Sequence, residues 1–185
     1  PPYPPPLSAF YNYHHILYLT DSAFTPVDSI YLDGEDHYKF FIKTILKADP
    51  DSIIVSVYAL DTMSGLKDAC IIWLNGELEI VQVRFYGQPD ISEELYAISC
   101  NHKGNIVMNQ GYLLATKGVG IFREIDMQGN IINESTDTSF ANKVYDLPEI
   151  QKYVFVQDPR FFLMNYMFNL DTVIETNGSI GANVT

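Results

Sequence analysis

The sequence predicts an all-β protein in which antiparallel strands are joined by hairpins. Three observations support this class: short runs rich in Ile, Val, Tyr and Phe, turn-forming residues between those runs, and a five-residue frame, Ile-x-x-x-Gly, that occurs four times. Such runs fit pleated, half-buried surfaces. Two architectures remain open within the class: an antiparallel β-sandwich or jelly roll, and a small four-unit β-propeller-like meander. A mixed α+β fold is the third alternative.

The chain divides into an arm, a domain and a tail. Residues 1–9 begin PPYPPP, and because proline lacks a backbone donor and fixes φ, they are expected to form an extended N-terminal arm. Residues 10–176 are expected to form a single β-rich domain, and residues 177–185 a polar C-terminal tail.

Within the domain, nine segments are expected as strands: 11–19, 51–60, 69–74, 77–85, 95–100, 105–109, 121–127, 130–133 and 152–156. Residues 37–46 carry apolar side chains on both faces and fit either a helix or a strand. Residues 159–170 follow a helix-start pair, Asp158-Pro159, but the repeat described next favours a strand there. Asn75-Gly76 is predicted to be a two-residue hairpin connection with positive φ at both residues.

The frame recurs as IYLDG at 30–34, IWLNG at 72–76, IDMQG at 125–129 and IETNG at 174–178. Its glycines have a period of roughly 45 to 50 residues, which is typical of a propeller blade. The apolar pairs Ile53-Ile54, Ile106-Val107 and Phe155-Val156 each precede the glycine of their unit by the same interval. Each unit would thus contain a strand and a returning strand that ends in Ile-x-x-x-Gly.

Two segments resemble propeller repeats. DSAFTPVDSIYLDGEDHYKFF at 21–41 resembles one hemopexin-type repeat through Asp21, Ala23, Phe24, Tyr31, Gly34, Asp36, Tyr38 and Phe40. This resemblance covers a short part of the chain and implies a module that binds a ligand or calcium. Residues 104–134 are similar to a single blade of quinoprotein-like and arylsulfotransferase propellers, but no cofactor ligand or catalytic histidine of those families can be placed on them.

Charge and hydropathy disfavour two classes of partner. The chain has 11 Lys and Arg against 23 Asp and Glu, which gives a formal net charge of −12 and repels nucleic-acid backbones. A membrane-spanning helix requires roughly 20 apolar residues in a row. The longest apolar run, FFLMNYMFNL at 161–170, is shorter than that, so no membrane span is expected.

The candidate sites are sparse. Asp33, Glu35 and Asp36 surround Gly34 and offer hard oxygen ligands, so calcium is the one ion considered and no organic cofactor is expected. Three glycosylation sequons begin at Asn133, Asn177 and Asn183. Together with the low charge content, they favour an extracellular, cell-surface or virion location.

No set of nucleophile, base and orienting group converges in the sequence, so the protein is expected not to be an enzyme. Cys70 and Cys100 could form one disulfide or remain buried thiols. The predicted function is that of a non-enzymatic structural or interaction protein, a subunit of a filament, capsid or surface layer. Its terminal arms would contact copies of itself or other subunits. The alternative is a small hemopexin-like β-propeller that binds a ligand or calcium, as part of a larger secreted protein.

Overall fold

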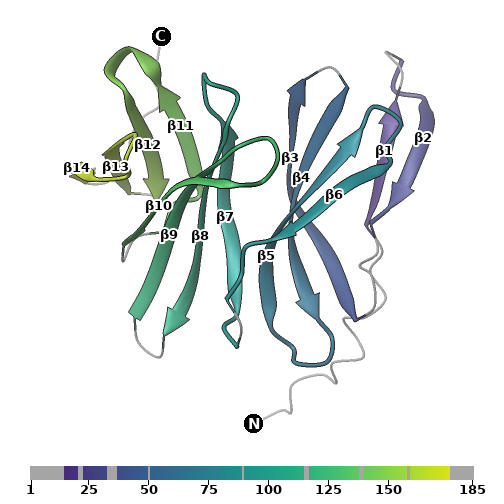
Figure 1. Ribbon diagram of the computed structural model, residues 1–185, viewed down its shortest axis with the longest axis horizontal. Helices are drawn as coiled ribbons and strands as arrows, with labels where there is room; N and C mark the ends of the chain where they lie inside the picture. The colour runs from purple at the N-terminus through teal and green to yellow at the C-terminus, as the bar shows by residue number, and fades with distance from the viewer. Residues whose placement is uncertain are drawn as a thin grey trace.

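The computed structural model describes residues 15–20, 23–32, 37–49, 51–88, 90–114, 117–137, 140–157 and 159–175 (Figure 1). Apart from one turn of 3₁₀ helix at Pro148–Ile150, every regular element in this part of the chain is a β-strand. All paired strands run antiparallel. The predicted all-β antiparallel class is therefore confirmed.

The strands form a ribbon and three four-stranded sheets. The ribbon pairs β1 (Ile16–Thr20) with β2 (Pro26–Tyr31). The first sheet contains β3 (Tyr38–Asp49), β4 (Ser52–Asp61), β5 (Lys67–Asn75) and β6 (Ile80–Phe85). The second contains β7 (Glu93–Cys100), β8 (Ile106–Leu114), β9 (Lys117–Ile125) and β10 (Ile131–Asp137). The third contains β11 (Lys143–Leu147), β12 (Lys152–Gln157), β13 (Arg160–Asn165) and β14 (Leu170–Glu175).

Neighbouring strands in each sheet are consecutive in the chain, so each sheet is a meander. This order corresponds to the meander alternative of the sequence prediction. The two segments whose type was left open contain strands: 37–46 overlaps β3 from Tyr38 onward, and half of 159–170 is β13, followed by the turn to β14. The nine expected strands all overlap strands of the structure, whereas β2 and β11 lie outside every expected segment and β14 overlaps one only at Leu170.

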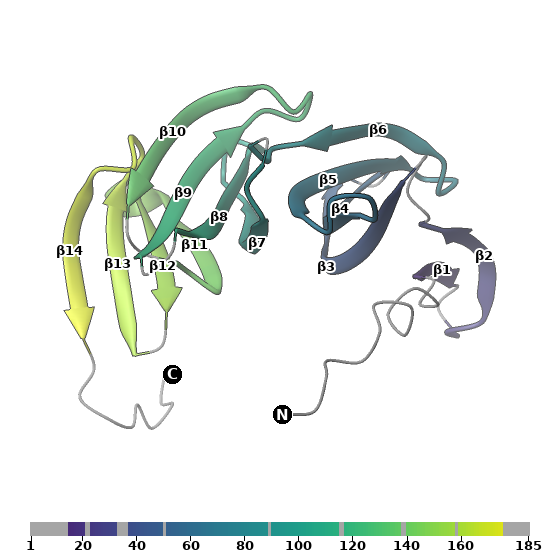
Figure 2. The ribbon, with the colours of Figure 1, turned by 90° about the horizontal axis from the view of Figure 1, so that it is seen from below.

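The four layers are stacked, with an apolar cluster between each pair of neighbours (Figure 2). Leu17 and Leu32 pack with Val55 and Ile72 between the ribbon and the β3–β6 sheet. The next cluster joins the β3–β6 and β7–β10 sheets through Ile54, Ile71, Trp73, Ile106 and Met108. The last joins the β7–β10 and β11–β14 sheets through Val107, Phe122, Tyr153, Phe155 and Phe162. In Figure 2 the layers fan out along an arc, with β6, β10 and β14 on its convex side.

The stacking explains why β4 and β5 read as continuous apolar runs. Successive side chains of a strand point to opposite faces of its sheet. Val55 belongs to the cluster under the ribbon, and its neighbour Ile54 belongs to the cluster under the β7–β10 sheet, and both are fully buried. A sheet covered on both faces needs apolar residues at every position, as in buried parallel sheets.

The predicted repeat is only partly right. The three apolar pairs do occupy equivalent places, because each lies in the second strand of a four-stranded sheet, β4, β8 or β12. The Ile-x-x-x-Gly frames do not: Ile72 lies within the third strand of its sheet, Ile125 ends a third strand, and Ile174 lies in a fourth strand. Gly34 and Gly178 lie outside the described residues.

The element that does recur is a turn that begins with Asn or Asp. The Asn75 Oδ1 accepts hydrogen bonds from the N–H groups of Glu77 (3.0 Å) and Glu79 (2.8 Å). The same pair of bonds, to the residues two and four positions later, forms at the other turns of this kind, which begin at Asn101, Asp126 and Asn165. A short side chain that bonds the following backbone in this way stabilises the turn.

In these turns the fourth residue has positive φ, and it is Leu78, Gly104, Gly129 or Phe168. The predicted two-residue hairpin at Asn75-Gly76 is therefore wrong. The connection extends to Glu79, and its positive φ (61°) falls on Leu78 rather than on Asn75 or Gly76. Leu78 tolerates this conformation because its side chain is buried in the cluster under the ribbon.

Candidate functional site

Most of the predicted site residues lie outside the described part of the chain. This holds for the calcium candidates Asp33, Glu35 and Asp36 and for the sequon residues Asn177 and Asn183. Within the described ranges, no group of three or more His, Cys, Asp or Glu side chains could hold a metal ion. Asn133 lies on β10, where its Nδ2 donates to the Tyr166 carbonyl oxygen at 2.8 Å. Glycosylation of Asn133 remains a prediction, and a glycan there would replace one of the two hydrogens of the Nδ2 that makes this bond.

The two cysteines are free thiols. Cys70 is buried in β5, and burial raises the pKa of its thiol far above the ordinary value. Cys100, at the end of β7, is partly buried, and the same cause raises its pKa. A raised pKa keeps both thiols protonated near neutral pH.

A polar cluster ties the second sheet to the third. The His102 Nδ1 lies 2.7 Å from the Asp146 Oδ2, and the Tyr166 hydroxyl donates to the Asp146 Oδ1 at 2.9 Å. Burial opposes ionisation of Asp146, but hydrogen bonds from the His102 backbone and ring and from Tyr166 lower the pKa of its carboxyl. Because these residues come from the β7–β8 turn, β11 and the β13–β14 turn, the cluster fixes two sheets against each other.

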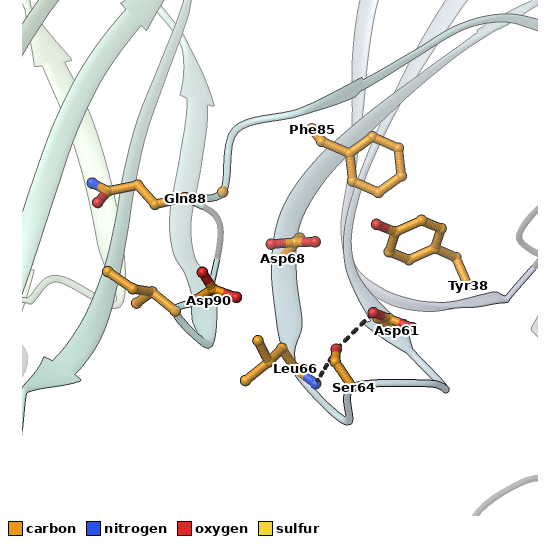
Figure 3. A pocket seen from close by; sticks show the side chains of 10 residues that line it. Tyr38, Asp61, Ser64, Leu66, Asp68, Phe85, Gln88 and Asp90 are labelled. Atoms are coloured by element: carbon orange, nitrogen blue, oxygen red, sulfur yellow. Dashed lines mark hydrogen bonds between the residues drawn. The ribbon is translucent and has the colours of Figure 1, made fainter.

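A cleft of about 400 Å³ opens beside the β3–β6 sheet, next to the segment that leads from β6 to β7 (Figure 3). Its side chains combine aromatic rings with carboxylates: Tyr38, Asp61, Asp68, Phe85, Gln88 and Asp90. The Tyr38 and Phe85 rings lie with their centroids 4.9 Å apart. Figure 3 shows Asp68 between these rings and Asp90.

The carboxylates of the cleft differ in their surroundings. Asp61 accepts from the Ser64 hydroxyl at 2.6 Å and from the Met63 N–H at 2.8 Å, and these bonds, the Ser64 bond first, lower its pKa. Asp68 has no hydrogen-bond or ion-pair partner among the described residues. Burial, and then the charge of Asp61, raise the pKa of Asp68.

Gly87 allows the chain to pass close to Asp68. A Cβ atom on Gly87 would lie 2.2 Å from the Asp68 Oδ1, so no larger residue fits without moving that carboxylate. The glycine therefore sets the shape of the cleft wall.

A second cleft, of about 320 Å³, adjoins the first through Asp90 and Ile91. Of its two carboxylates, Asp90 and Glu94, the second is already paired: the Lys67 Nζ lies 2.5 Å from one Glu94 oxygen and the Lys43 Nζ 3.8 Å from the other. The hydrogen bond from Lys67 is the main cause of the lowered pKa of Glu94. The first cleft contains Asp68, a carboxylate that has no partner among the described residues and is open to a cationic group.

A buried polar network lies behind the clefts and crosses all four strands of the β7–β10 sheet. The Arg123 guanidinium donates to the Gln110 Oε1 (2.5 Å), to the Tyr86 carbonyl (2.8 Å) and to Glu134. The Gln110 Nε2 in turn donates to the Glu93 Oε2 at 3.0 Å. The sequence analysis missed this network because its members are isolated polar residues on separate strands.

Glu93 is the member of this network whose hydrogen bonding is incomplete. Its side chain is fully buried, and its Oε1 has no hydrogen-bond partner in the described part of the chain. Burial raises the pKa of Glu93 to about 7, although the charge of Arg123 acts in the opposite direction. The network therefore contains a carboxyl group that titrates near neutral pH.

Comparison with known proteins finds a similar fold among solved structures. No protein-family model matches the chain, and no curated protein matches it. A crystal structure of a protein of unknown function from Bacteroides caccae is similar, with a TM-score of 0.57 and 10% sequence identity. The similarity covers 90% of this chain and 59% of that chain, so this chain spans less than two thirds of the length of that structure. At this identity the similarity supports the fold alone.

Hydropathy agrees with the expectation about membrane spans. Among the residues that the structure describes, no helix has the length and apolar character needed to cross a membrane.

Proposed function

We propose that this chain is a non-enzymatic interaction protein that acts as a subunit of an extracellular or surface assembly. One observation carries the proposal: the outer face of the β11–β14 sheet, called here the end face, presents apolar side chains on all four strands, with Lys143, Lys152 and Thr172 among them. The end face is the side of this sheet that points away from the β7–β10 sheet (Figure 2).

Register defines the end face. In β12 and β13, Tyr153, Phe155 and Phe162 are buried against the β7–β10 sheet, so the residues between them point outward. Cross-strand pairs then align two rows on the outer side. One row contains Tyr145, Val154, Leu163 and Thr172, and the other contains Lys143, Val156, Phe161 and Ile174.

No described part of the chain covers this face. Tyr145 is 50% exposed and Ile174 47% exposed, and no strand of the described residues packs on their side of the sheet (Figure 2). The β3–β6 and β7–β10 sheets have equally apolar faces, but each of them lies between two other layers. A contiguous exposed apolar patch on a folded protein is typical of a protein contact.

The proposal differs from the sequence-based expectation in the surface that makes the contact. Residues 1–9 and 177–185, the expected contact arms, lie outside the described residues, so their role remains a prediction. The extracellular or surface location is likewise a prediction that rests on the sequons and the low charge content.

Replacing Leu163 with lysine is expected to abolish association, because the substitution places a charge in the middle of the end face. The unchanged protein should sediment above its chain mass of 21.0 kDa at tens of micromolar, and Leu163→Lys should sediment at that mass. Met63→Lys is the matched control, since Met63 is 83% exposed at the β4–β5 turn, away from the end face. Equal masses for the unchanged protein and Leu163→Lys would contradict the proposal.

A second candidate function is the binding of a cationic ligand, favoured by the unpaired carboxylate of Asp68 beside two aromatic rings. An ammonium group is attracted both by a carboxylate and by the faces of aromatic rings. The cleft of about 400 Å³ is within the size range of small-molecule sites.

Choline and calcium chloride, added separately, test this second function. A ligand that binds the folded state raises the melting temperature. Choline is expected to raise it for the unchanged protein and for Glu77→Gln, which lacks an exposed carboxylate of the β5–β6 turn, but not for Asp68→Asn. An equal rise in all three proteins would indicate a general salt effect and exclude the site. A rise with calcium alone would favour a calcium module instead.

A further inference from the structure

We propose that the first cleft, the one of about 400 Å³ beside the β3–β6 sheet, binds an aliphatic diamine. One ammonium group of the ligand would pair with Asp68 and the other with Asp90. This inference rests on the second candidate function, the binding of a cationic ligand, and names the chemical class of that ligand.

Two carboxylates of the first cleft lack a partner. Among the residues that the structure describes, neither the Asp68 nor the Asp90 side chain makes a hydrogen bond or an ion pair. Asp61, the third carboxylate, is different, because it accepts hydrogen bonds from Ser64 and Met63. Two uncompensated negative charges in one cleft repel each other, and a ligand with two positive charges would compensate both.

The two carboxylates come from different walls of the cleft. Asp68 lies on β5, and Asp90 lies in the segment between β6 and β7. Both line the same space, and Figure 3 shows the Asp90 carboxylate turned toward Asp68. A ligand that spans the cleft can therefore contact both.

The acidic side chains do not converge on one point. Within the described ranges, no group of three or more His, Cys, Asp or Glu side chains could hold a metal ion. Calcium requires about six to eight oxygen ligands around a single ion. Carboxylates that are set apart suit two separate positive charges better, and a diamine provides these on one chain.

The rest of the lining suits the carbon chain of such a ligand. Leu66, Phe85, Ile91 and the ring of Tyr38 line the same cleft. Methylene groups are stabilised by contact with apolar side chains, and an ammonium group is attracted by the face of an aromatic ring. No Lys or Arg is among the residues that line the cleft, so no basic side chain of the lining competes for the carboxylates.

A buried carboxyl group behind the cleft is affected by this charge. Glu93 is fully buried, and its Oε1 has no hydrogen-bond partner in the described part of the chain. Burial is the main cause of its raised pKa, and the negative charge of Asp68 acts in the same direction, against the charge of Arg123. The charge of the cleft is thus not balanced within the fold, and a bound dication would balance it.

The second cleft provides a contrast. Its Glu94 is compensated by Lys67 and Lys43, which belong to the same chain. The unbalanced pair of carboxylates is therefore a property of the first cleft. The formal net charge of −12 attracts cations to the whole surface, so an experiment has to separate this site from the overall charge.

Isothermal titration calorimetry at neutral pH and constant ionic strength provides the test, with putrescine and butylamine as probes. The two amines have the same carbon chain, but putrescine has two ammonium groups and butylamine has one. The unchanged protein is expected to bind putrescine at least about tenfold more tightly. This factor is the usual effect of one additional hydrogen bond between charged groups.

Asp90→Asn isolates the second carboxylate. Asparagine keeps the size of the side chain and tolerates the positive φ of 64° at this position, so the variant should remain folded. It is expected to bind putrescine and butylamine with about equal affinity. Asp68→Asn should weaken the binding of both amines. Glu77→Gln, which makes the same change of charge at an exposed turn, should bind both amines as the unchanged protein does.

The opposite results overturn the inference. If the unchanged protein binds both amines equally, the ligand is not a diamine, and a rise in melting temperature with choline would still support the second candidate function. If Asp90→Asn keeps the preference for putrescine, Asp90 does not hold the second ammonium group and the inference is wrong. If magnesium chloride binds as tightly as putrescine, charge alone explains the binding. If neither amine binds and choline has no effect, both the inference and the second candidate function are wrong.

Discussion

Phe155→Ala is expected to lower the free energy of unfolding by about 3–5 kcal/mol, the usual cost of removing a buried phenylalanine. Phe155 is fully buried at the centre of the cluster between the β7–β10 and β11–β14 sheets. Its ring meets that of Phe122 edge to face, with centroids 4.6 Å apart, and also contacts the rings of Tyr153 and Phe168. The substitution removes these contacts and leaves a cavity that four surrounding strands cannot fill.

Urea unfolding, followed by circular dichroism, measures this loss. Phe24→Ala is the matched control, because Phe24 is 87% exposed and its removal should change stability by less than about 0.5 kcal/mol. Domains of this size are typically stable by about 5–15 kcal/mol, so Phe155→Ala should remain folded or nearly so in water. A loss below about 1 kcal/mol would show that the two sheets do not pack through Phe155.

Stability is expected to fall by about 2–3 kcal/mol as pH rises from 4.5 to 7, through the titration of Glu93. Burial raises the pKa of this carboxyl to about 7 in the folded protein. Between its ordinary pKa and 7, the unfolded chain has lost the proton and the folded chain still holds it. Unfolding therefore becomes more favourable as pH rises through this window, and the effect levels off above pH 7.

Glu93→Gln isolates this contribution, because glutamine keeps the shape of the side chain and the acceptor for Gln110 but does not ionise. The difference in unfolding free energy between the two proteins should favour Glu93→Gln progressively from pH 4.5 to 7 and then become constant. Glu77→Gln, at an exposed turn, should show no such trend. If the difference between Glu93→Gln and the unchanged protein does not vary with pH, the pKa of Glu93 is the same in the folded and the unfolded chain, which contradicts this account.

The sequence predicts the all-β class well, because the buried strands consist largely of apolar residues that can be recognised in the sequence. A run such as SIIVSVYALD in β4 is short, apolar and bounded by turns, and this combination indicates a buried strand. β2 and β11 escaped prediction because PVDSIY and KVYDL are short and contain polar residues, and only pairing with neighbours makes them strands. The stacking order of the sheets has no signal in one sequence.

The turns show where local rules fail. Glycine marks positive φ in the turns at Gly104 and Gly129, but Leu78 and Phe168 occupy the same place in the other two. The left-handed conformation destabilises the fold by about 1 kcal/mol or more at a non-glycine residue. Burial of a large apolar side chain stabilises it by about 1.5–3 kcal/mol, which offsets that cost. Because only two of the four turns have glycine at this place, the Ile-x-x-x-Gly frame does not align the sheets with one another. The Asn or Asp that begins each turn does align them.

The candidate site was harder to predict than the fold. The clefts and the Arg123 network combine residues from different strands, such as Glu93, Gln110 and Arg123, which pairing brings together. No spacing in the sequence links them. The acidic cluster at 33–36, which the sequence does mark, lies outside the described residues.

Small-angle X-ray scattering of the unchanged protein tests the central claim, that the end face of the β11–β14 sheet binds a second copy of the chain. A compact pair of 185-residue chains should have a radius of gyration of about 21 Å. This value should hold on dilution through the micromolar range. A value of about 16 Å, that of a single compact chain of this length, would contradict the account.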